Sequence, residues 1–119
     1  MMFHTIVSKI ANRIECSRSG CCMFFAEWAT RTLFKNKIKN FVVIEGWVKG
    51  EKENFWRQHT WIEHEGQRID PTFIQFDGLN VKHMGRIKRK LTPEEYLSLC
   101  STYPTTPQQM KYYLKKVEK

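Results

Sequence analysis

Residues 55–70, FWRQHTWIEHEGQRID, decide the fold of this chain. The aromatic and β-branched residues of the stretch 55–63 predict a strand. The dipeptide Glu65-Gly66 predicts a tight turn, and residues 68–70 predict a short third strand that returns along the previous one. The sequence therefore predicts an antiparallel β-hairpin in the middle of the chain.

The geometry of this hairpin depends on the length of its loop. If Glu65 and Gly66 form a two-residue loop, Trp61 lies opposite Asp70, and His59 shares a face with Trp61 because side chains alternate along a strand. Asp70 is then a diagonal neighbour of His59, roughly 7–8 Å away between backbone positions, and its carboxylate can reach the imidazole. A three-residue loop would move Asp70 to the opposite face.

The chain before the hairpin predicts two helices and a strand. Apolar residues recur at helical spacing over roughly 2–15 and again over about 22–35, which indicates two amphipathic helices. Residues 41–48 are rich in β-branched and aromatic side chains and predict a strand. We therefore expect an α+β fold in which N-terminal helices pack on a small antiparallel sheet.

The chain after the hairpin predicts a basic extension. We expect residues 73–90 to be irregular, ending in the basic run 82–90. Two helix-start signals, Thr-Pro-Glu-Glu at 92–95 and Thr-Pro-Gln-Gln at 106–109, then predict short helices. The segment 82–119 holds 9 basic and 3 acidic side chains. Such a segment is typical of a solvated surface, or of a face for nucleic acid or an acidic partner.

Length and composition limit the class of protein. A chain of 119 residues predicts a single domain, here with a core over about 1–76 and the basic extension after it. A hydrophobic content of 41% excludes a disordered chain. The apolar run at 41–44 is far shorter than the roughly 20 residues of a membrane span. The N-terminus lacks the signal-peptide pattern, so we expect a cytoplasmic protein with reduced thiols.

Cys22 lies at the predicted start of the second helix, directly after Gly20-Cys21. Unpaired N–H groups and the helix dipole stabilise a thiolate at such a position. A cysteine nucleophile also needs a base and a group that orients the base. His59 and Asp70 would complete a Cys-His-Asp triad. The alternative is that Cys22 is a buried structural thiol, which is common for free cysteines.

Three motifs resemble those of the transglutaminase-like superfamily. The stretch 20–26, GCCMFFA, resembles the nucleophile motif G-x-C-x-x-F-A. The stretch 59–63, HTWIE, resembles H-A-W-x-E, with Thr60 in place of alanine. The stretch 69–72, IDPT, resembles x-D-P-T. The motifs occur in family order. The small proteases that remove leader peptides during lasso-peptide maturation are similar in size and motif order, as are other compact members, including phage-encoded ones.

The resemblance implies a papain-like α+β core and acyl transfer from an amide to water or an amine, without a cofactor. It implies Cys22 as nucleophile, His59 as base and Asp70 as orienting residue. Cys21 competes for the first role, but Cys22 keeps the four-residue step to Ala26. The implied substrate is a peptide or protein that carries an amide. The candidates for the walls of the substrate cleft are Cys21, Trp61 and Trp47.

One sequence feature is less complete than in the family pattern. We find no convincing side-chain donor for an oxyanion upstream of Cys22, and Asn12 is distant in sequence. The backbone N–H of Cys22 at the helix start could serve instead.

Other function classes remain open from the sequence. A zinc site from Cys16, Cys21 or Cys22 with His59 or His64 lacks a C-x-x-C pair, so we expect no metal. A non-catalytic basic protein on the same fold could bind nucleic acid or an acidic protein partner through residues 82–90 and 111–119. The exposed stacking platforms of such a protein would be Trp47, Trp56 and Trp61. An enzyme needs one fast-reacting thiol, whereas a binder loses affinity steeply as salt rises.

Overall fold

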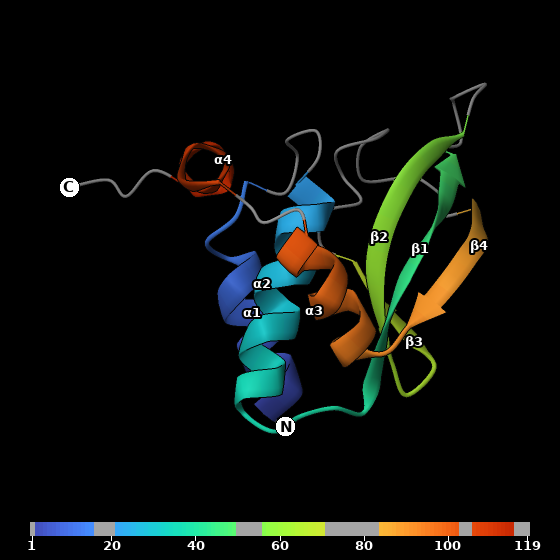
Figure 1. Ribbon diagram of the computed structural model, residues 1–119, viewed down its shortest axis with the longest axis horizontal. Coiled ribbons are helices and arrows are strands. Elements are labelled where there is room, and N and C mark those ends of the chain that lie inside the picture. The colour runs from blue at the N-terminus through green and yellow to red at the C-terminus, as the bar shows by residue number, and fades with distance from the viewer. Residues whose placement is uncertain (1, 16–20, 50–55, 71–83, 103–105, 116–119) are drawn as a thin grey trace.

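Helices flank one side of a four-stranded sheet in the computed structural model, which describes residues 2–15, 21–49, 56–70, 84–102 and 106–115. The elements in chain order are α1 (Met2–Ala11), α2 (Cys21–Lys35), β1 (Phe41–Lys49), β2 (Arg57–His64), β3 (Gln67–Ile69), β4 (Met84–Leu91), α3 (Pro93–Thr102) and α4 (Pro107–Tyr113). Figure 1 shows α1, α2 and α3 gathered beside the sheet, with α4 farther from it. The predicted α+β class, with N-terminal helices on a small antiparallel sheet, is confirmed.

The sheet has the strand order β3-β2-β1-β4, and all three pairings are antiparallel. In the β2–β3 hairpin, Ile62 lies opposite Ile69 and His64 lies opposite Gln67. The loop therefore consists of Glu65 and Gly66, with φ angles of 51° and 77°. Positive φ at both central residues is the signature of the type I′ turn, whose twist suits a hairpin. Of the two loop lengths that the sequence left open, the structure has the two-residue loop.

The sheet is buried on both faces at its centre. Val43 and Ile62 lie opposite each other in the main core, together with residues of α1, α2 and α3. Ile44 and Trp61 also lie opposite each other, but they belong to a second buried cluster. Because side chains alternate along a strand, these two pairs point to opposite faces of the sheet. His59 shares the face of Trp61.

The expectation of irregular structure over 73–90 is wrong where the structure can test it. Residues 84–91 form strand β4, which pairs with β1; residues 71–83 lie outside the described part of the chain. The register shifts between Glu45 and Gly46, which pair with Arg89 and Ile87 and leave Lys88 as an extra residue. Residues 87–90 are exposed on both faces, so β4 lacks the alternation that predicts a strand.

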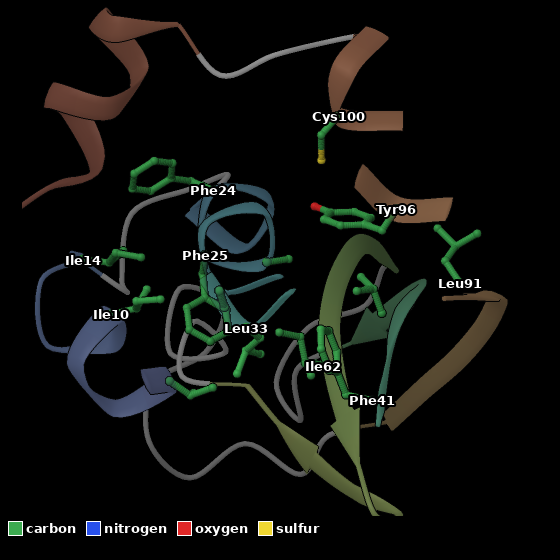
Figure 2. Close-up of a cluster of buried hydrophobic side chains, with 14 of the residues drawn as sticks. Ile10, Ile14, Phe24, Phe25, Leu33, Phe41, Ile62, Leu91, Tyr96 and Cys100 are labelled. Carbon is green, nitrogen blue, oxygen red and sulfur yellow. The ribbon is translucent and has the colours of Figure 1, made fainter. Parts of the chain in front are cut away.

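The expected basic appendage is also wrong for residues 84–102. Leu91, Tyr96 and Cys100 are buried in the same cluster as Phe25 and Leu33 (Figure 2). This part of the chain therefore completes the core, whereas the expected core ended at about residue 76. Only α4 is peripheral among the described helices: it has no buried residue.

Contacts at the ends of the first and last helices hold α4 in place. Tyr113 stacks on Phe24 of α2 at 5.5 Å between ring centres, and Ile14 forms an isolated bridge with Leu114. Helix α1 ends at Ala11 rather than near residue 15, because a turn leads into this bridge. In the described ranges, no helix combines the length and the apolar character required to cross a membrane.

We predict that Leu91→Ala destabilises the protein far more than Ile87→Ala. Leu91 is 7% exposed and faces the main core, whereas Ile87 is 51% exposed on the same strand. Truncating a buried leucine costs about 2–5 kcal/mol of unfolding free energy, and an exposed truncation stays within about 0.5 kcal/mol. Urea denaturation of both variants measures this difference. Equal and small effects would show that β4 is the appendage expected from the sequence.

Candidate active site

His59 and Asp70 are joined by a short hydrogen bond inside the protein. The distance from Nε2 of His59 to Oδ2 of Asp70 is 2.6 Å. The two side chains are 0% and 5% exposed. Asp70 directly follows the last residue of β3, and the two-residue turn sets it beside the strand that carries His59. The hydrogen bond is therefore a direct consequence of the hairpin register.

Cys22 lies in the first turn of α2, near the imidazole of His59. Its side chain is buried, and it lies near enough to His59 to raise the pKa of the imidazole. Because Asp70 occupies Nε2, Nδ1 is the ring nitrogen that remains for the thiol. The structure thus brings together the three residues that the sequence predicts as a triad.

The pKa of His59 is raised from 6.5 to about 9. Burial is the largest single influence and acts in the opposite direction, because it disfavours the charged imidazolium. The hydrogen bonds and charges of Asp70 and Cys22 together outweigh it. At neutral pH the site therefore favours an imidazolium at His59.

The other residues expected near the site take different positions. Cys21 is fully buried in the main core, so Cys22 is the thiol that meets His59. Trp61 is also buried, and its ring stacks near that of His59 at 5.9 Å between centres. Trp47 is 37% exposed and lies opposite Gln58, on the sheet face away from His59. Of the expected cleft residues, only Trp61 adjoins the imidazole.

Tyr96 of α3 supports the helix start that carries Cys22, a contact that was not predicted from the sequence. Its hydroxyl donates a hydrogen bond to the Met23 carbonyl oxygen at 3.3 Å. Burial raises its pKa above the ordinary value, so the group stays protonated and remains a donor. Figure 2 shows this hydroxyl directed toward α2, with the Cys100 sulfur nearby. The predicted capping box of Thr92 and Glu95 fixes the start of α3.

His64 has a structural role. Its ring stacks on Phe3 at 3.9 Å between centres, and its Nδ1–H donates to the Asn40 carbonyl oxygen at 3.0 Å. Within the described ranges, no three His, Cys, Asp or Glu side chains gather as metal ligands. Cys16, named in the zinc alternative, lies outside those ranges.

Searches of protein-family models, of curated proteins and of solved structures find no match to this chain.

We predict that Asp70→Asn lowers the pKa of His59, because the substitution removes the strongest influence that raises it. In the wild type, the folded-state pKa lies above the unfolded value of 6.5, so protonation of His59 stabilises the fold. This stabilisation is complete below pH 6.5 and is lost as the pH rises toward 9. NMR titration of the imidazole and urea denaturation across this range measure both effects. An unchanged pKa in the variant would mean that Asp70 does not control His59.

Proposed function

We propose that this protein is a cysteine-dependent acyl-transfer enzyme that acts on an amide. Cys22 is the nucleophile, His59 the acid–base residue and Asp70 the residue that orients the imidazole. The observation that carries the proposal is the buried 2.6 Å hydrogen bond between His59 and Asp70, with Cys22 in reach of the same ring. A structural histidine can be satisfied by one partner, whereas this ring joins a carboxylate to a thiol at a helix start.

The reaction begins with attack of the Cys22 thiolate on the amide carbonyl carbon. A carbon–sulfur bond forms, and the negative charge moves to the carbonyl oxygen. The backbone N–H of Cys22 in the unpaired first turn of α2 is a donor for this oxyanion. His59 then donates its proton to the amide nitrogen, the carbon–nitrogen bond breaks, and the amine leaves. The product of this half-reaction is a thioester on Cys22.

The second half-reaction returns the enzyme to its starting state. Neutral His59 accepts a proton from water or from an acceptor amine, which attacks the thioester carbon. The carbon–sulfur bond breaks, and Cys22 leaves as a thiolate beside the newly formed imidazolium. Water gives hydrolysis, and an amine gives transamidation. Asp70 keeps Nε2 of the ring in its hydrogen bond throughout, so Nδ1 stays directed at the reacting atoms.

The resemblance of the three motifs to the transglutaminase-like superfamily supports a peptide or protein as the substrate. It also supports a papain-like arrangement of the core and an enzyme of the compact leader-protease type. The nucleophile position is consistent with this comparison, because Cys22 rather than the fully buried Cys21 adjoins the imidazole.

A second candidate function rests on the exposed cations of β4. Lys88, Arg89 and Lys90 are exposed in succession on an edge strand, which suits an acidic protein partner or nucleic acid. Arg89 is partly engaged by Glu45 at 2.7 Å. A binder of this kind loses affinity steeply as salt rises and is indifferent to Cys22→Ala.

We predict that Cys22→Ala abolishes labelling by an electrophilic peptide probe and changes the free energy of unfolding by about 1 kcal/mol or less. The thiolate is the reacting atom, whereas a small substitution in a first helical turn removes little packing. Mass spectrometry identifies the labelled cysteine. Cys100→Ala is the matched control and keeps full labelling, because burial and Glu27 raise the pKa of the Cys100 thiol to about 11. Unfolding of Cys22→Ala would instead identify Cys22 as a core residue.

We predict that Asp70→Asn reduces turnover on the order of 10–1000-fold, while substrate binding changes little. The carboxylate stabilises the imidazolium that pairs with the thiolate, and an amide does not. Single-turnover kinetics and the pH profile of Cys22 alkylation measure the loss. Full turnover with an unchanged alkylation profile would reduce the triad to a Cys22–His59 dyad.

A further inference from the structure

The guanidinium of Arg68 in β3 lies over the Trp61 ring, which in turn stacks near the imidazole of His59. Its guanidinium carbon is 5.1 Å from the centre of the Trp61 ring. The Trp61 ring is in turn 5.9 Å from that of His59. These two spacings place the guanidinium no more than about 11 Å from the imidazole centre. This distance is comparable to the length of two or three residues of an extended peptide.

Arg68 forms no ion pair with another residue in the described part of the chain. Glu63 lies directly opposite it on β2. Opposite charges at such positions usually pair across a sheet, yet the guanidinium lies over Trp61 instead. Partial burial lowers the pKa of Arg68. Asp70 and Glu63 act on Arg68 only through their charges, which raise this pKa. The side chain as a whole is exposed.

A guanidinium held in this way suits a carboxylate. Contact with an aromatic ring restrains the planar group, and the N–H donors around its rim stay available to solvent. Two of these donors match the two oxygens of a carboxylate in a fixed geometry. Trp61 is 1% exposed, so its position is set by the core and the guanidinium rests on a rigid support.

We propose that Arg68, supported by Trp61, binds a carboxylate of the substrate close to the amide that Cys22 attacks. The inference rests on the proposed function and adds a substrate class to it: peptides that carry an acidic side chain or a free carboxyl terminus beside the reacting amide. Arg68 is thus a specificity residue, and His59 and Asp70 perform their roles without it.

Three small chloroacetyl compounds test this inference on the intact protein. Chloroacetyl-glutamine amide is neutral, chloroacetyl-glutamate amide carries a side-chain carboxylate, and chloroacetyl-glutamine carries a terminal carboxylate. Each alkylates a reactive thiol, and peptide mapping with mass spectrometry gives the rate at Cys22. We expect at least one anionic compound to react about two- to tenfold faster than the neutral one, as one charge at this distance permits. The faster compound identifies the source of the carboxylate.

Variants assign the preference to Arg68. Arg68→Gln should remove the preference and leave the rate of the neutral compound within about twofold, whereas Arg68→Lys should keep only part of it because lysine lacks the planar pair of donors. Arg13→Gln is the matched control. Arg13 is also exposed, and its guanidinium carbon is 5.2 Å from the Trp28 ring centre, on the helical side of the protein. This variant should keep the full preference.

The outcomes separate the two proposals. Equal rates for all three compounds, a preference that survives Arg68→Gln, or an equal loss in Arg13→Gln would overturn the role of Arg68 and leave the cysteine enzyme intact. Failure of every compound to label Cys22 faster than Cys100 would overturn both proposals.

Discussion

The turn at Glu65-Gly66 fixes the position of Asp70, and the candidate site depends on it. A glutamate at a φ of 51° adopts a left-handed conformation that costs about 1–2 kcal/mol relative to ordinary backbone. The hairpin tolerates this cost because the register it imposes places Ile62 opposite Ile69 and brings Asp70 to His59. A slip of one residue in the register would place the Asp70 carboxylate on the other face of the sheet. The buried His59 imidazole would then lose its hydrogen bond to Asp70.

Burial and neighbouring groups act in opposite directions on the pKa of His59. Removing His59 from water favours its neutral form, and only the combined effect of Asp70 and Cys22 reverses this preference. A buried charge is stable only when it is paired and hydrogen-bonded. The three side chains therefore form one electrostatic unit, in which the loss of Asp70 or of Cys22 lowers the pKa of His59. Such coupling is typical of catalytic groups, although structural networks share it.

Local patterns in the sequence predicted the elements that form the triad. The alternation of side chains and the Glu65-Gly66 turn gave the hairpin, and the helix start gave the position of Cys22. Strand β4 was missed because an edge strand with Lys88, Arg89 and Lys90 exposed has no apolar period to detect. The contact of Tyr96 with the Met23 carbonyl joins positions 73 residues apart, and no local pattern encodes it. The choice of Cys22 over Cys21, by contrast, rested on a local pattern, the four-residue step from Cys22 to Ala26.

The late position of β4 and α3 in the chain has a consequence for the order of events during synthesis. Cys22, His59 and Asp70 all precede residue 71, but the strand beside β1 and the tyrosine that contacts the first turn of α2 follow residue 83. A nascent chain that has exposed only the triad lacks one edge of its sheet and part of its core. The ribosome must release residues 84–102 before the main core can close around α2. The buried surroundings of α2 are therefore complete only once residues 84–102 have joined the core.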